Sequence, residues 1–434
     1  MAENNLFQLS PLAEFHPSSH SRSWASVPNP GLQPLIVTAS ADKTARVYSL
    51  EDFTLHSILE GGHSRSVRSV AWKPTINNDA PLTLATGSFD ATLGIWRHTK
   101  EQCNDEKQDQ DIILKDFTHE NLAESAQLQN VSNETDDEPD WEFSIVLEGH
   151  DSEIKHVAYS PSGQFLASCS RDKSIWIWEE IGAEGEADFE TVAVLQDHTA
   201  DVKCISWRKD DGKGEMLASA SYDDTIRFWR DVDNEGEWEC TGTLVGHEAT
   251  VWALEWEPDV SISLTHAISE EQEQKYTPRL MSASADGTIR LWSPIDISPT
   301  PTRPSYHDVY IPSTMRPAPT MEKWEVTATL PKAHQMPIYS ISWSKKTGRV
   351  TSSGCDGKIV VYEERIKRKE VENSGTEMEW VIICSLENSH GPYEVNHVTW
   401  CGRWDDGQNG ENEMIVSTAD DGSIRAWTLD EIAA

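Results

Sequence analysis

The feature that most constrains this chain is an internal repeat. Its clearest copy is GHDSEIKHVAYSPSGQFLASCSRDKSIWIW, which runs from Gly149 to Trp178. Three short apolar runs in this stretch have strand length and alternating polarity, and they are separated by Pro161-Ser162-Gly163 and Arg171-Asp172-Lys173. Runs of this kind joined by tight polar turns predict a three-stranded antiparallel meander.

Seven copies of the pattern can be aligned on an aspartate in the second turn. An aromatic residue follows each aspartate by six positions, a small hydroxyl residue precedes it by four, and a histidine lies further upstream. The aspartate–aromatic pairs are Asp42–Tyr48, Asp90–Trp96, Asp172–Trp178, Asp223–Trp229, Asp286–Trp292, Asp356–Tyr362 and Asp421–Trp427; the hydroxyl residues are Thr38, Thr86, Ser168, Ser219, Ser282, Ser352 and Ser417; the histidines are His20, His63, His150, His198, His247, His334 and His390. A period of roughly 40 residues, a Gly-His start and an aromatic end are typical of four-stranded propeller blades.

The repeat resembles the WD-repeat family and predicts an all-β, seven-bladed WD-repeat β-propeller that forms one domain over residues 1–434. Only TLDEIAA follows Trp427, so we expect the N-terminal segment 6–15 to supply the outer strand of blade seven and to close the ring. The expected blades are 16–61, 62–148, 149–196, 197–245, 246–332, 333–388 and 389–434, with an acidic insertion at 99–140 in blade two and insertions at 260–278 and 293–322 in blade five.

The histidine, hydroxyl, aspartate and tryptophan of a blade are expected to form a buried hydrogen-bond network that holds its loops and strands together. The members expected to do this are His63, Thr86, Asp90, Trp96, His150, Ser168, Asp172, Trp178, His198, Ser219, Asp223, Trp229, His247, Ser282, Asp286 and Trp292. The same residue types make up a Ser-His-Asp catalytic triad. We discount that interpretation because a nucleophile needs one exposed serine, whereas this set recurs in blade after blade.

Composition narrows the function classes. The formal charge of −37 argues against binding to a phosphate backbone or an anionic membrane surface. No apolar run reaches membrane-spanning length, and the first residues, MAENNLFQLS, do not form a secretory signal. The seven cysteines are scattered without a Cys-x-x-Cys pair, which predicts no metal or cofactor site and a reducing compartment, the cytoplasm or the nucleus. Segment 99–140 is strongly acidic and 293–322 is proline-rich, compositions that predict disorder or an extended linker.

Loop lengths point to one binding face. We call the edge of the ring that carries the histidines and turn aspartates the top; every long insertion falls in loops of the bottom edge. Three positions in each blade should project onto the top around the axis. They lie three residues after the histidine, five residues after the histidine, and one residue before the aspartate. The cations and aromatics there are the candidate partner-binding residues Arg68, Phe89, Lys155, Arg171, Lys203, Tyr222, Trp252 and Tyr339. Such a set suits a peptide with a carboxylate and an apolar or aromatic residue; the alternative is that these are ordinary solvated residues.

A narrower resemblance lies in blades three to five, about Trp141 to Trp292. The segments SCSRDKSIWIWE, VLQDHTADVKCISW, ASASYDDTIRFWRD and TLVGHEATVWALEW resemble the WD-repeat subunit of the cytosolic iron–sulfur protein assembly targeting complex, in its fungal type. The resemblance implies a non-catalytic scaffold that helps transfer [4Fe–4S] clusters to cytosolic and nuclear apoproteins. It implies as partners a small acidic-loop assembly factor, a HEAT-repeat subunit, a hydrogenase-like iron–sulfur carrier and iron–sulfur apoprotein clients. In that family the arginine matching Arg171 lies on an interaction surface.

Two other classes remain open. One is a generic WD-repeat adaptor, such as a ubiquitin-ligase substrate receptor or a chromatin peptide reader. The other is an enzyme with its chemistry at the axial channel, which would need acid–base groups or metal ligands where the sequence places cations and aromatics. Since a fold alone does not determine function, the scaffold interpretation depends on the motifs of blades three to five.

Overall fold

The fold was analysed in a computed structural model. It describes residues 7–31, 33–75, 81–98, 141–182, 188–210, 212, 214–232, 236–258, 278–295, 321–367 and 378–432. Nearly all of the segments 99–140, 260–278 and 293–322, for which disorder or an extended linker is expected, lie outside these residues. None of the described residues forms a helix long and apolar enough to cross a membrane.

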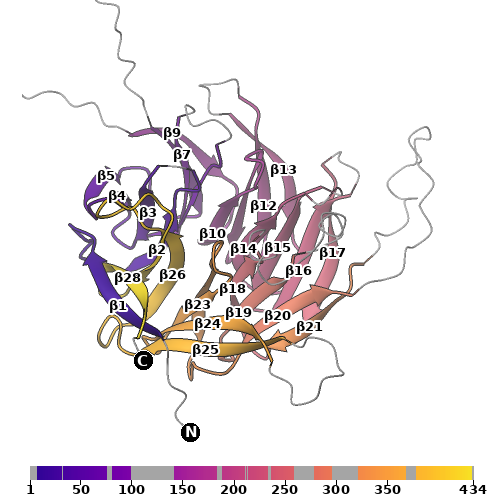
Figure 1. Ribbon diagram of the computed structural model, residues 1–434. Coiled ribbons are helices and arrows are strands. Elements are labelled where there is room, and N and C mark those ends of the chain that lie inside the picture. Colours follow the sequence, from indigo (N-terminus) through magenta and orange to yellow (C-terminus); the bar gives the residue numbers. More distant parts are fainter. Residues whose placement is uncertain are drawn as a thin grey trace, which may run out of the picture.

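Twenty-eight strands form seven four-stranded antiparallel sheets around a common axis (Figure 1). From the axis outward, the sheets of blades one to six are β2 (Ser23–Pro28), β3 (Leu35–Ser40), β4 (Ala45–Ser49) and β5 (Leu55–Leu59); β6 (Val67–Trp72), β7 (Thr83–Ser88), β8 (Thr92–His98) and β9 (Trp141–Glu148); β10 (Ile154–Tyr159), β11 (Phe165–Ser170), β12 (Ile175–Glu180) and β13 (Phe189–Leu195); β14 (Val202–Arg208), β15 (Met216–Ser221), β16 (Thr225–Asp231) and β17 (Trp238–Val245); β18 (Val251–Trp256), β19 (Leu280–Ser284), β20 (Ile289–Pro294) and β21 (Trp324–Thr329); and β22 (Ile338–Trp343), β23 (Val350–Gly354), β24 (Ile359–Ile366) and β25 (Met378–Leu386).

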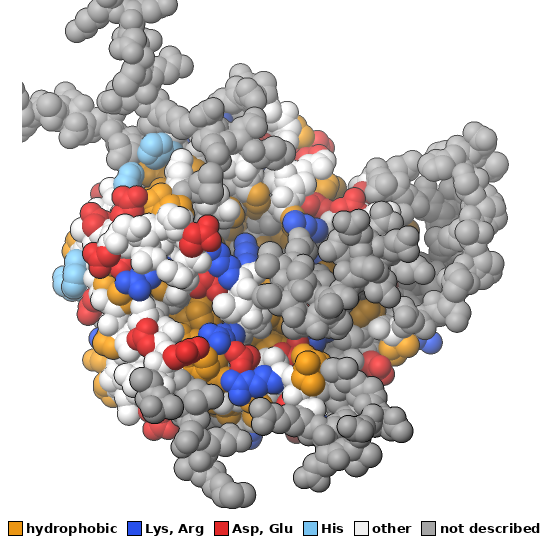
Figure 2. Space-filling view, viewed as in Figure 1, with side chains coloured by type: hydrophobic (Ala, Val, Ile, Leu, Met, Phe, Trp, Pro, Cys, Tyr) orange, Lys and Arg blue, Asp and Glu red, His pale blue; other side chains and the backbone are white. Residues whose placement is uncertain are grey.

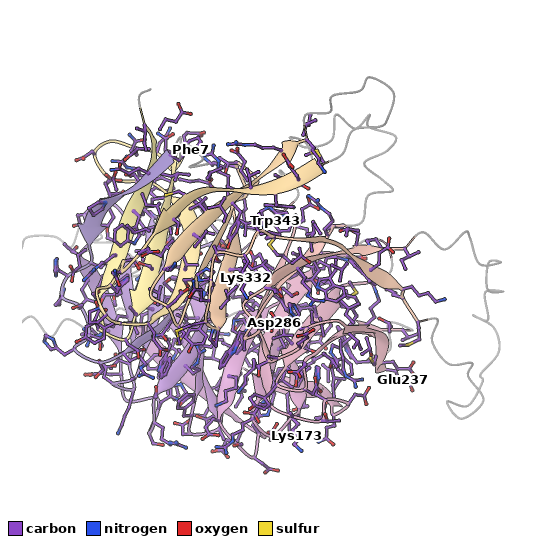
Figure 3. The ribbon with its side chains drawn as sticks, turned by 90° about the horizontal axis from the view of Figure 1, so that it is seen from below. Phe7, Lys173, Glu237, Asp286, Lys332 and Trp343 are labelled. Carbon is purple, nitrogen blue, oxygen red and sulfur yellow. The ribbon has the colours of Figure 1, made fainter. Side chains whose placement is uncertain are left out.

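The seventh sheet joins the two ends of the chain. It consists of β26 (Val395–Gly402), β27 (Glu413–Ala419), β28 (Ile424–Glu431) and β1 (Phe7–Glu14). β1 pairs with β28 from Phe7↔Glu431 to Glu14↔Arg425, and Figure 3 shows Phe7 on the indigo strand beside the yellow C-terminal strands. The predicted seven-bladed propeller and its closure by the N-terminal strand are confirmed. This pairing completes the seventh sheet, so that β28 is covered by a neighbouring strand.

The hydrophobic core lies between blades. Each of seven clusters of buried apolar side chains combines residues of two neighbouring blades. Between blades one and two, Val37 and Val47 pack with Trp72 and Trp141, whose rings lie 6.0 Å apart. The Trp72 indole also donates to the Val27 carbonyl of the preceding blade at 2.9 Å. Since each sheet buries both faces against its neighbours, the ring is rigid and presents its loops from fixed positions.

Candidate partner-binding face

In five blades the polar set at the top forms a chain of short hydrogen bonds, which we call the tetrad; in blade six His334, Ser352 and Asp356 are joined in the same way, with Tyr362 at the position of the tryptophan. In blade four, His198 donates from Nδ1 to Asp223 at 2.9 Å, and its Nε2 accepts from the Ser219 hydroxyl at 2.8 Å. Ser219 in turn accepts from the Trp229 indole at 2.8 Å. The same arrangement joins His63, Thr86, Asp90 and Trp96, with a longer His63–Asp90 separation of 3.4 Å; His150, Ser168, Asp172 and Trp178; His247, Ser282, Asp286 and Trp292; and His390, Ser417, Asp421 and Trp427.

The tetrad is a structural device. Burial alone would raise the pKa of Asp223, but hydrogen bonds from His198 and Thr225 outweigh it and hold the pKa well below the ordinary value. The Ser219 side chain is 0 % exposed and its oxygen already bonds to an imidazole and an indole. The resemblance to a catalytic triad is therefore one of residue types, because this hydroxyl cannot reach a substrate.

Blade one departs from the pattern. The expectation that His20 is its histidine is wrong: His20 is exposed, and the buried Ser19 occupies the position. The Ser19 hydroxyl donates to Asp42 at 2.9 Å. The innermost strand of blade one begins four residues after Ser19, as β14 begins four residues after His198. Because a serine cannot span the distance an imidazole spans, the blade has no tetrad, and Tyr48 bonds instead to the Pro17 carbonyl at 2.9 Å.

Every innermost strand carries a β-bulge at its top end. The register shifts between the first and third residues of β2, β6, β10, β14, β18, β22 and β26. The second residue of each strand is therefore left out of the ladder, and a bulge of this kind re-aims its side chain. We call these seven residues the axial belt: Trp24, Arg68, Lys155, Lys203, Trp252, Tyr339 and Asn396.

Belt side chains and their neighbours contact one another around much of the axis, mostly as cations on aromatic rings. Lys155 Nζ lies 4.7 Å from the Phe89 ring centre, and Lys203 Nζ lies 5.4 Å from that of Tyr222 and 5.1 Å from that of Trp252. Further contacts join Arg68 to Trp24 (5.0 Å), Trp24 to Phe89 (6.0 Å), Trp252 to Tyr339 (5.2 Å) and the Tyr339 hydroxyl to Glu394 (3.1 Å).

The structure thus brings seven of the eight candidate residues into or against the belt. Arg171 stands apart from them. Its side chain is 60 % exposed and it pairs with Glu153 at 3.4 Å, further out on the same top edge. Glu153 also accepts from the Ser152 hydroxyl, and this bond is the main reason that its pKa is lowered to about 2. Arg171 is therefore the accessible cation of the set, and Lys155 and Lys203 are partly buried.

Sequence reasoning missed two members of this surface, Arg22 and Trp24. The Arg22 guanidinium lies 4.8 Å from the Trp24 ring centre and pairs with Asp420 at 2.7 Å, which links blade one to blade seven. The error follows from aligning blade one on His20, which shifts its top positions by one residue. The spacing of four residues to the first strand would have identified Ser19 and, with it, both missing side chains.

The visible part of the face shown in Figure 2 carries no large single-sign patch. Acidic and basic side chains are interspersed there, with hydrophobic side chains between them. The six described cysteines are free, and no group of three or more possible metal ligands occurs in the described parts of the chain.

Comparison with known proteins decides the family. The model described as WD domain, G-beta repeat matches residues 54–97, 141–179, 189–230, 238–293 and 324–363. A protein of Botryotinia fuckeliana named probable cytosolic iron-sulfur protein assembly protein 1 is 58% identical over 98% of this chain and 98% of its own length. Proteins of the same name are 57% identical in Sclerotinia sclerotiorum (97% of this chain, 95% of theirs) and 40% identical in Neurospora crassa (97% and 96%). The chain belongs to this family of WD-repeat proteins.

The family's repeat is offset from the blade by one strand. The matched span 54–97 includes β5, the outer strand of blade one, and the first three strands of blade two. The other four matched spans run the same way from one outer strand to the third strand of the next blade. Each repeat therefore covalently bridges two blades, and the offset is the reason that the ring has to be closed by a strand from the other end of the chain. A WD-repeat propeller and the names of these relatives are consistent with a non-catalytic protein.

Proposed function

We propose that this chain is a non-catalytic scaffold of cytosolic iron–sulfur protein assembly, acting in the cytoplasm and also reaching nuclear clients. The observation that carries the proposal is identity of 58% and 57% over nearly the full length of relatives with that name. A rigid ring with a face of cations and aromatics supports it, because such side chains supply charge-assisted bonds and large, rigid contact area.

The proposed partners are proteins: a small acidic-loop assembly factor, a HEAT-repeat subunit, a hydrogenase-like iron–sulfur carrier and the apoprotein clients. The [4Fe–4S] cluster is cargo that passes between these partners. On the top face, Arg171 would receive a partner's carboxylate, because it is exposed and held by a single acidic neighbour at 3.4 Å. Tyr222, which is 59 % exposed, would offer an aromatic contact on the same face.

The test is affinity purification from native cytosol with wild type and Arg171→Glu. We expect wild type to retrieve a HEAT-repeat subunit and several [4Fe–4S] apoproteins, and Arg171→Glu to lose at least part of them. A matched control is Arg365→Glu at the far end of β24, because Arg365 is likewise a partly exposed cation paired with a glutamate, Glu363.

One result would overturn the proposal, and another would remove only the role of Arg171. Retrieval of a ubiquitin ligase or of histones in place of iron–sulfur proteins would favour a generic adaptor. Equal retrieval by wild type and Arg171→Glu would retain the scaffold but remove Arg171 from its binding face.

A further inference from the structure

Arg68 carries a positive charge that no carboxylate of the described residues pairs with. The charged side chain that most affects it is another cation, Arg22. Its guanidinium lies 5.0 Å from the Trp24 ring centre. Loss of hydration lowers the pKa of Arg68 to about 10. Because a cation withdrawn from water is costly without a counter-charge, this site favours an anion from outside the chain.

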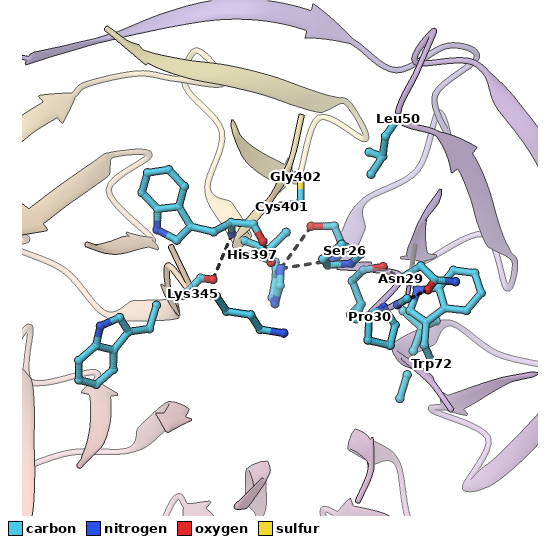
Figure 4. A pocket seen from close by; sticks show the side chains of 18 of the residues that line it. Ser26, Asn29, Pro30, Leu50, Trp72, Lys345, His397, Cys401 and Gly402 are labelled. Carbon is cyan, nitrogen blue, oxygen red and sulfur yellow. Dashed lines mark hydrogen bonds between the residues drawn. The ribbon is translucent and has the colours of Figure 1, made fainter. Parts of the chain in front are cut away.

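Two histidines lie one layer deeper along the axis. His156 and His397 are the third residues of β10 and β26, directly after the belt residues of those strands. Both line an axial cavity of about 540 Å³ that also receives the side chain of Lys345 (Figure 4). We call these two histidines, together with Arg68 of the belt layer above the cavity, the axial throat.

Hydrogen bonds to the neighbouring blades determine which imidazole nitrogen carries the proton. His156 Nδ1 accepts the backbone N–H of Ile205 at 3.4 Å. His397 Nδ1 accepts the backbone N–H of Ser26 at 3.4 Å, a bond drawn in Figure 4. Since Nδ1 accepts in both rings, the proton of each neutral imidazole lies on Nε2. Each ring therefore retains one N–H donor that its contact with the next blade does not use.

Arg68 is the charged side chain that acts on both throat histidines. Burial and, after it, the charge of Arg68 lower the pKa of His156 to about 4. Burial, His156 and Arg68 lower the pKa of His397 to about 3. Lys155, whose pKa is lowered by burial and by Lys203, lies in the belt layer above. The carboxyl group of Glu255 also lines the cavity, from the fifth residue of β18, two residues beyond the level of the histidines. Burial raises the pKa of Glu255 to about 7.

We propose that the axial throat binds a small oxyanion, a phosphate or a carboxylate group, which pairs with Arg68 and accepts hydrogen bonds from Nε2 of His156 and His397. A planar guanidinium presents paired N–H donors to two oxygens of such a group, and the imidazoles donate to the oxygens that remain. The anion would supply the counter-charge that the described residues do not place beside Arg68.

The throat site goes beyond the proposed function and is tested separately from it. A free anion such as inorganic phosphate and a carboxylate of a docked protein share the same chemistry. The proposal concerns the purified chain and small anions, whereas the scaffold function concerns capture of proteins through Arg171. Failure of one experiment therefore leaves the other standing.

The experiment is a thermal unfolding and calorimetric titration of the full chain in chloride buffer at constant ionic strength. Sodium phosphate and sodium acetate are the probes, and sodium chloride is the control. Because phosphate stabilises many proteins without a specific site, the decisive comparison is between variants. Arg68→Gln removes the throat cation, and Arg171→Gln removes an exposed cation from the same face as a matched control.

We expect wild type and Arg171→Gln to show a saturable rise in Tm with phosphate or acetate, and Arg68→Gln to lose at least tenfold in affinity. Without added anion, Arg68→Gln should melt higher than wild type, because the buried charge is gone. A response of equal size in wild type and Arg68→Gln, or none beyond chloride in wild type, would overturn the proposal. The probe that saturates distinguishes phosphate from carboxylate.

A second measurement covers the case in which Arg68→Gln does not fold. Nitrogen and proton NMR of the histidine rings in wild type should show the Nε2–H signals of His156 and His397 moving with the same saturation curve as the calorimetric response. The imidazole signal of exposed His20 is the internal control and should not move. Unchanged throat signals at saturating anion would refute the site.

Discussion

The tetrads and the axial belt occupy fixed positions in the same repeat, yet they differ in how far the blades agree. In five blades the tetrad consists of a histidine, a serine or threonine, an aspartate and a tryptophan. The belt holds a different mixture at one position of the repeat: two tryptophans, a tyrosine, three cations and an amide. The tetrad satisfies buried polar groups that every blade has. Among the belt residues, Asn396 also satisfies a buried group, since it donates to the Ser23 carbonyl at 3.0 Å. The cations and aromatic residues of the belt do not repeat one such bond from blade to blade, so their identity is free to serve binding.

Within the tetrads, loss of an aspartate is expected to have the largest effect. Asp223→Ala removes the acceptor for His198, for the Thr199 N–H and for Thr225, at 2.6–3.0 Å, and should lower the free energy of unfolding by about 3 kcal/mol. The control is Asp42→Ala in blade one, which has no imidazole to leave unpaired, and about 1 kcal/mol is expected there. Urea unfolding measures both. Equal losses would show that the histidine adds nothing to the blade.

Acidification should destabilise the residues at the axis and the tetrads over different pH ranges. His156 and His397 have folded pKa values of about 4 and about 3, below the ordinary value of about 6.5, so they fold as neutral rings. Because the unfolded chain takes up protons on these histidines before the folded chain does, the free energy of unfolding is highest above about pH 6.5. It decreases as the pH falls from about 6.5 toward 4. The tetrad aspartates act later: Asp90, with a pKa of about 2, loses its contribution only as the pH falls below about 4.

The measurement is Tm against pH in a buffer without phosphate. The variant His156→Gln/His397→Gln keeps an oxygen that can accept the N–H groups of Ile205 and Ser26 and does not titrate. Its Tm should fall less than that of wild type between pH 7 and pH 5. Parallel curves for the two proteins would show that the throat histidines do not control acid stability.

A belt ring should contribute the smallest effect. Phe89→Leu keeps an apolar side chain but removes the π-face under Lys155, at a cost of about 0.5–1 kcal/mol. Phe89→Tyr retains that face and should be close to wild type in the same urea unfolding measurement. A cost for Phe89→Leu as large as that of Asp223→Ala would contradict the division between a tetrad that stabilises and a belt that is available for binding.

Much of the architecture could be predicted because its causes are local. The alternation of apolar residues, the turn aspartates and the missing last strand lead directly to blades and to closure by residues 7–14. Blade one shows the limit of pattern matching, since a histidine beside Ser19 satisfied the motif by type although it does not lie in the tetrad. Strand spacing, which reflects backbone geometry, was the more reliable signal there.

The sequence by itself determined the repeat, the number of blades and which residue types meet inside each one, because these depend on neighbours within about 40 residues. Only the tertiary structure decided which residues of different blades share the axis. Trp24 and Arg68 belong to different blades, as do His156 and His397, and they come together because closure of the ring brings the bulged ends of the seven innermost strands to one place. The lack of an ion-pair partner for Arg68 among the described residues follows from its position at the axis and could not be read from the residues of its own repeat.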